Sequence, residues 1–174
     1  MFFRNRAARR RNREIVEATY KALTMRARRP VLFIDGGVED TVMGRFESVC
    51  LELFLFLRRC REDSALSAFT QDLVDHFITD VEHSIRELGV GDPSVPKRMR
   101  KLAGYFYERV AVYDKAMDDA DPQSALSVAL VGRAVADPGK ATALAELAIA
   151  EQALLRAVST QTILSGQLEG AFPA

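Results

Sequence analysis

Five side chains that could bind a metal ion or move a proton lie on one face of a helix predicted over residues 64–88. They are Asp72, His76, Asp80, His83 and Glu87. The Asp80-x-x-His83 spacing imitates the carboxylate-x-x-His step of helical di-metal sites. Such a site needs a second helix with the same pair, yet these are the only two histidines of the chain. We interpret the face as a solvated polar surface, with a single divalent ion on Asp80 and His83 as the alternative.

Other catalytic patterns are missing from the sequence. It has no Gly-x-Ser-x-Gly elbow, no His near either Cys, and no Lys-Ser/Thr after Gly36-Gly37. Cys50 and Cys60 are ten residues apart on one predicted helix, about 15 Å along its axis, which rules out a disulfide between them. The sequence therefore predicts no enzyme, no metal and no cofactor, and two buried reduced thiols.

Four cations fall within the first two turns of a helix that Ser94 is expected to cap: Lys97, Arg98, Arg100 and Lys101. Cations at that end oppose the helix dipole and cost about 0.3–1 kcal/mol each. Either nearby acids such as Asp92 offset them, or the patch binds something negative. Tyr105 and Tyr107 lie off the core stripe of this helix, as core flanks or as a contact surface. No nucleic-acid motif surrounds them, so nucleic acid is not an expected partner.

The charge is zero overall but unevenly distributed. Residues 1–61 carry 14 Lys/Arg against 7 Asp/Glu, a net of +7, and the remainder carries a net of −7. A basic segment over residues 1–12, with Phe2 and Phe3 in front of its arginines, is either a frayed terminus or an attachment to anionic lipid. No apolar run follows to form a secretory signal, so we expect a cytoplasmic protein.

The stretch over residues 41–61 organises the predicted fold. Stepped at 100° per residue, it is apolar over about two thirds of its circumference, with one polar stripe of Arg45, Ser48, Glu52 and Arg59. Such a helix must be covered by several neighbours. Its longest charge-free run, Leu53–Leu57, is far shorter than the roughly 20 residues of a membrane span.

Periodicity and end signals predict five further helices, over residues 13–29, 64–88, 95–117, 122–135 and 140–164. Asn12 and Asp40 are the expected N-caps of the first and the central helix, and residues 30–40 are expected to be an extended connector. The predicted fold is an all-α, single-domain bundle of about six helices around the central helix (residues 41–61), with the helical domain over residues 13–170.

These residues resemble the ubiquinol–cytochrome c chaperone family over roughly residues 20–170. The resemblance rests on the order and spacing of short motifs: Asp40-Thr41, Gly44-Arg45-Phe46-Glu47, Leu57-Arg58-Arg59, Phe77 with Asp80, Arg86–Asp92, Val95-Pro96-Lys97, Phe106-Tyr107 with Arg109, Tyr113-Asp114, and Leu126 with Ala129-Leu130. It implies a compact bacterial-type assembly chaperone of cytochrome bc1 that binds cytochrome b or bc1 assembly intermediates. It would lie at the inner face of the cell membrane, in peripheral contact with anionic lipid. A small co-chaperone, as mitochondrial members have, is a further candidate partner.

The charge pattern and the resemblance together predict a partner-binding surface. Its residues are Arg45, Asp92, Lys97, Arg98, Arg100, Lys101, Tyr107 and Arg109. Arg45 has a structural alternative, an ion pair with Glu52 or Asp40. Two other function classes stay open at this point. One is a lipid- or quinone-binding helical carrier with an apolar cavity beside the central helix, and the other is a helical metal-dependent enzyme.

Overall fold

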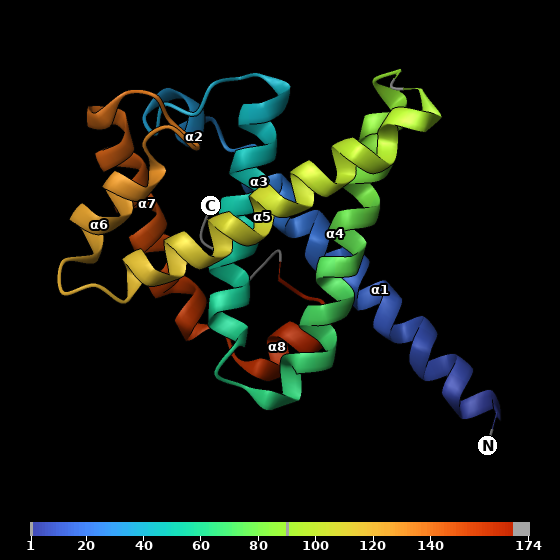
Figure 1. Cartoon of the computed structure of the whole chain (residues 1–174). Helices are drawn as coiled ribbons and strands as arrows, with labels where there is room; N and C mark the ends of the chain where they lie inside the picture. Colours follow the sequence, from blue (N-terminus) through green and yellow to red (C-terminus); the bar gives the residue numbers. More distant parts are fainter. Residues whose placement is uncertain (1, 90, 169–174) are drawn as a thin grey trace. The chain divides into compact units, whose positions relative to one another are not determined.

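Helices make up nearly all of the regular structure. The computed structural model describes residues 2–89 and 91–168, and the side chains among them from Arg9 onward. Within these ranges the chain forms eight α-helices, two short 3-10 turns and one isolated bridge between Val131 and Val135, and no strand (Figure 1). The predicted all-α class is confirmed.

The six longest helices correspond to the six predicted ones. They are α1 (Phe2–Arg26), α3 (Val42–Cys60), α4 (Ser67–Glu87), α5 (Val95–Met117), α6 (Pro122–Leu130) and α7 (Pro138–Ala157). Two short helices, α2 (Pro30–Ile34) and α8 (Thr160–Ser165), were not predicted. The 3-10 turns Ser64–Leu66 and Asp92–Ser94 lead into α4 and α5.

Helix α3 is buried on almost every side. Leu53 and Phe56 are fully buried, as the apolar run predicts. Two residues of the polar stripe, Ser48 and Glu52, are buried as well, at only 1% and 2% exposed. Arg29 donates to Glu52, and a paired carboxylate can be buried where an unpaired one cannot.

The N-cap of α3 is Thr41 instead of the predicted Asp40. Thr41 Oγ1 accepts a hydrogen bond from the Gly44 N–H at 3.1 Å. Asp40 instead accepts from Nε of Arg45 at 2.6 Å, with both side chains exposed. Of the two ion pairs considered as the structural alternative for Arg45, the structure contains the one with Asp40.

Helix α1 begins at Phe2, so the predicted start at Arg13 is wrong. Asn12 lies within the helix, and its Nδ2 donates to Oδ2 of Asp72 on α4 at 2.6 Å. The Asn12 side chain, which was expected to cap the first helix, therefore forms a tertiary contact with α4 instead. The predicted basic segment over residues 1–12 continues directly into the same helix. The side chains of Phe2 and Phe3, in front of the arginines of that segment, lie outside the described ones.

Three other predicted boundaries shift. Residues 30–34 are the helix α2 and not extended, because Pro30 supplies a helical φ at its first position. The helix predicted to run to residue 135 ends at Leu130, with Gly132 at a φ of 73° just beyond. The last predicted helix breaks after Ala157, and Ser159 then caps α8 by accepting from the Thr162 N–H.

The backbone contacts divide the chain into two compact units. The first comprises Met1–Ala22, Cys60–Tyr105 and Val158–Ala174, and the second comprises Leu23–Arg59 and Phe106–Ala157. The single domain predicted over residues 13–170 stays a prediction.

In the first unit, α4 supplies much of the core through Phe69, Leu73 and Phe77. The polar face of α4 meets α1: the Tyr20 hydroxyl donates to Asp80 at 2.8 Å, and the Tyr20 ring lies edge-on to His76 at 4.9 Å. Asp80, the strongest metal-ligand candidate of the sequence, therefore has a structural partner. Among the described residues, no three His, Cys, Asp or Glu side chains form a group suited to a metal ion.

In the second unit, α6 packs along α7 (Figure 1). Gln123 of α6 donates to Glu146 of α7 at 2.7 Å. Two arginines from the end of α1 and the residues after it reach buried carboxylates of α3 and α7. We call this set, Arg26, Arg29, Glu52 and Glu151, the inner cluster.

The inner cluster is bound together through Arg29. Its Nη2 donates to Glu52 at 2.8 Å and to Glu151 at 2.5 Å, and Arg26 also pairs with Glu151. Burial and the neighbouring Glu151 carboxylate raise the pKa of Glu52 to about 8, although Arg29 and Arg26 oppose the rise. Burial also raises the pKa of Glu151, but Arg26 and Arg29 outweigh it, so its pKa lies below the usual value.

Replacing Glu52 by Gln should remove a pH dependence of stability. A carboxyl group whose pKa is raised on folding holds its proton more tightly in the folded chain. The folded state therefore loses stability as the pH rises from about 4.5, the ordinary value, to about 8. Glu52→Gln should not lose this stability. The difference between its free energy of urea unfolding and that of the natural protein should therefore change in favour of the variant as the pH rises through this window, by up to about 1.4 kcal/mol per pH unit. The exposed variant Glu17→Gln should follow the natural curve, and parallel curves for Glu52→Gln would contradict the assignment.

Candidate partner-binding surface

The four predicted cations at the start of α5 all lie at the surface. Lys97, Arg98, Arg100 and Lys101 are exposed. Val95 and Phe106, on the opposite side of the same helix, are buried. Lys101 places its ammonium group 5.5 Å from the centre of the Tyr105 ring, a cation–π contact. The core spacing of the helix thus turns its basic residues outward.

Asp92 does not pair with these cations. Arg86 of α4 donates from Nη1 to Asp92 and from Nη2 to Glu82, the latter at 2.8 Å. Among the residues that the structure describes, no carboxylate forms an ion pair with Lys97, Arg98 or Arg100. The positive charge at this end of α5 is therefore not offset by an ion pair in the described structure, although each cation there opposes the helix dipole.

Two large apolar or aromatic side chains are exposed on α4 and α5. Tyr107 of α5 is 57% exposed, and its ring contacts the buried Phe106 ring at 5.3 Å between centres. Leu88, at the end of α4, is 61% exposed, and Gly89 behind it ends the helix with a φ of 78°. Aromatic side chains and arginines are frequent in binding hot spots, so Tyr107 suits a contact role.

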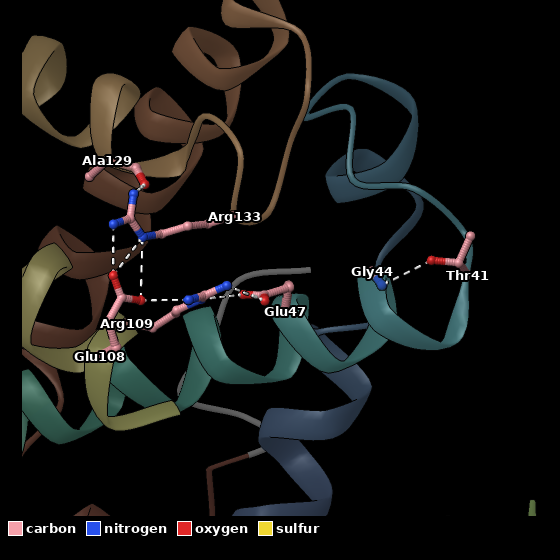
Figure 2. Close-up of polar contacts among 7 residues, drawn as sticks. All are labelled: Thr41, Gly44, Glu47, Glu108, Arg109, Ala129 and Arg133. Carbon is pink, nitrogen blue, oxygen red and sulfur yellow. Dashed lines mark hydrogen bonds and ion pairs between the residues drawn. The ribbon is translucent and has the colours of Figure 1, made fainter. Parts of the chain in front are cut away.

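Arg109 does not belong to the exposed surface. It is 9% exposed, and its Nε and Nη2 donate to the two carboxylate oxygens of Glu47 at 3.0 and 2.8 Å (Figure 2). The predicted contact role of Arg109 is therefore corrected: a guanidinium that both oxygens of a buried carboxylate bind cannot reach a partner. The sequence spacing could have predicted this burial. Positions 106, 109, 110 and 113 lie on one helical face, so Arg109 falls within the core stripe.

Glu47 and Arg109 belong to a longer chain of charges. Glu108 accepts from Arg109 and from Nη2 of Arg133 at 2.7 Å, and Arg133 Nη1 donates to the Ala129 carbonyl at 2.9 Å (Figure 2). We call Glu47, Glu108, Arg109 and Arg133 the Glu47 network. It ties α3 to α5 and to the turn after α6. Sequence reasoning missed Glu108 and Arg133 because these two partners are 25 positions apart in the sequence.

Gly44 lets the chain before α3 approach the helix closely. A Cβ at this position would lie 1.9 Å from the Glu39 carbonyl oxygen, so any side chain would force the backbone apart. A cavity of about 210 Å³ beside Gly44 is lined by Glu39, Met43, Glu47 and Arg133 among others. Glu47 and Arg133, two of the lining residues, already have hydrogen-bond partners in Arg109 and Glu108.

The first unit contains a larger groove between α1 and α4. Its volume is about 830 Å³, and its walls include Arg9, Arg13, Asp72 and Asp75. Both hollows thus have charged walls. A lipid- or quinone-binding carrier predicts an apolar cavity beside α3, whereas charged side chains stand in the walls of both of these hollows.

The two cysteines are free and buried. Burial and the nearby Glu47 carboxylate raise the pKa of the Cys50 thiol. A buried protonated thiol is a poor nucleophile, which agrees with the structural role predicted for Cys50.

Comparisons with known proteins agree with this architecture. A family model described as ubiquinol-cytochrome C chaperone matches residues 35–172. A solved structure, described as the crystal structure of the Cbp3 homolog from Brucella abortus, is 36% identical in sequence with a TM-score of 0.81. The match covers 95% of this chain and 94% of that one. A search of curated proteins found no match.

Replacing Arg109 by Met should lower the free energy of unfolding by about 3–5 kcal/mol, because the Glu47 carboxylate would stay buried without its two donors. Adding Glu47→Gln to this variant should recover part of the loss, since an amide costs less to bury than a charge. Denaturant unfolding of both single variants and the double variant measures the coupling. The exposed variant Arg28→Met should stay within about 0.5 kcal/mol of the natural protein. Strictly additive losses would show that the pair is not coupled.

Proposed function

Because the chain belongs to the ubiquinol–cytochrome c chaperone family, we propose that it is an assembly chaperone of the cytochrome bc1 complex that binds cytochrome b. The observation that carries the proposal is the unpaired positive charge at the start of α5. A family assignment gives the class of task, and this surface gives the chemistry by which the chain would perform it.

The proposed contact surface is the basic surface, defined as Lys97, Arg98, Arg100 and Lys101. Its cations are exposed, and Asp92, the acid before α5, is already bound by Arg86. Such a patch attracts a negatively charged segment of the partner and speeds the encounter. Tyr107 extends the surface along α5 as an aromatic contact.

Three of the other predicted contact residues have different roles. Arg45 is exposed in the second unit and pairs with Asp40, so a partner carboxylate would compete with Asp40 for it. Asp92 fixes Arg86 beside the loop that precedes α5. Arg109 contributes from inside, by holding α5 against α3 through Glu47.

A peripheral position at the inner face of the cell membrane fits this role. No helix in the described part of the chain is long and apolar enough to cross a bilayer. The first turns of α1 carry the exposed residues Arg9, Arg11 and Arg13, which suit anionic headgroups. A small co-chaperone is a further proposed partner. Holding an unassembled membrane protein requires a binding surface and no reacting group, so the proposed role is not enzymatic.

Replacing Lys97, Arg100 and Lys101 together by Glu should weaken the capture of cytochrome b by about tenfold or more, because like charges would then face the acidic partner segment. Crosslinking from membranes, followed by quantitation of cytochrome b against the natural protein, measures this. The loss should shrink as salt rises, since exposed charges are screened.

The matched control reverses three exposed cations elsewhere, Arg28, Lys115 and Arg156, and makes the same change in net charge. This control should capture cytochrome b as the natural protein does. Equal capture by both triple variants would exclude the basic surface as the contact. Failure of the natural protein to capture cytochrome b at all would overturn the proposed function.

A further inference from the structure

Nothing in the structure of α5 requires a glycine at position 104. It lies near the middle of a helix of 23 residues and is exposed. Its φ is not in the left-handed region, and a Cβ added there would meet nothing within 4 Å. Among ordinary residues only proline is less favourable than glycine inside a helix. The chain therefore accepts a weaker helix at a site where a side chain would fit freely.

Gly104 lies in the middle of the outward face of α5. Lys97 and Arg100 precede it by seven and four positions, and Tyr107 and Ala111 follow it by three and seven. All four neighbours are exposed. Steps of three and four residues keep positions on one side of a helix, and this alternation is the one by which helices pack together.

We propose that an α-helix of the partner crosses α5 at Gly104 and directs carboxylates toward Lys97, Arg100 and Lys101. A glycine at a crossing point lets two helix backbones approach closely, which a side chain at that position would prevent. The exposed Tyr107 ring would cover the crossing on its other side. The inference rests on the proposed function and specifies its partner segment as an acidic helix of cytochrome b.

The absence of a side chain at Gly104 distinguishes a partner helix from a lipid surface as the group that binds here. Anionic headgroups bind cations wherever they are exposed and gain nothing from a glycine. A closely packed helix needs both the opposite charge and the space. The basic residues and Gly104 on one face of α5 therefore favour a helix over a membrane.

Two substitutions of Gly104 test the crossing. Gly104→Ala should raise the midpoint of thermal unfolding by about 2–4 °C, because alanine is the better helix former. The same variant should capture cytochrome b about tenfold more weakly, because its methyl group enters a close backbone contact. Gly104→Leu should abolish capture. A more stable protein that binds less well cannot owe its loss of binding to unfolding.

The control variant Ala153→Leu places the same larger side chain on an exposed position of α7 and should capture cytochrome b normally. A photoreactive group at Tyr107 should crosslink to residues three or four apart on one acidic helix of cytochrome b. Normal capture by both Gly104 variants, or crosslinks spread over an extended segment, would overturn the inference and leave the proposed function standing. No capture by the natural protein would overturn both.

Vesicles of phosphatidylcholine with phosphatidylglycerol test the competing occupant. Co-sedimentation that depends on the basic surface, together with cytochrome b capture that does not, would assign the surface to lipid and overturn the inference. Cytochrome b capture that depends on both the basic surface and Gly104 would support it.

Discussion

Pairing of the charges on α3 is the constraint on which the second unit depends. This helix is buried on almost every side, yet it carries Glu47, Glu52 and Arg58 into the interior. Removing the partner of a buried charge costs several kcal/mol, so each of these groups requires its partner. Arg109 of α5 binds Glu47, Arg29 binds Glu52, and Asp114 of α5 binds Arg58. Two of these ion pairs join α3 to α5 and the third joins it to Arg29, so they fix which segments cover α3 and in which register.

The predictions from sequence succeeded where one element decides its own structure. The apolar run of α3 and the core stripe of α5, with Val95, Phe106 and Tyr113 buried, follow from spacing alone. The end of α4 at Gly89 and the cap of α6 at Asp121, which accepts from the Ser124 N–H, are equally local. Periodicity and end signals need no knowledge of the neighbours.

The predictions from sequence failed where a residue far away in the chain determines the local structure. The partners of Glu52 were not foreseen, because the residues of its cluster, Arg29 and Glu151, are 23 and 99 positions away. Asn12 is an ordinary cap residue, and only Asp72, 60 positions on, explains why it lies inside α1 instead. Asp40 and Thr41 are both good caps, and the exposed Arg45 decides between them by binding Asp40. A single sequence does not show these pairings.

The same distinction separates fold from contact among the residues that carried the family resemblance. Gly44, Glu47 and Arg109 have complete explanations inside the molecule: a close backbone approach and a doubly bonded buried ion pair. Lys97 and Tyr107 are exposed, and the internal contacts of the described structure do not require a cation or a phenol at these positions. A residue whose type the interior does not determine is free to be determined by a partner. This is why the outward face of α5, and not the charged network behind it, is where recognition should be sought.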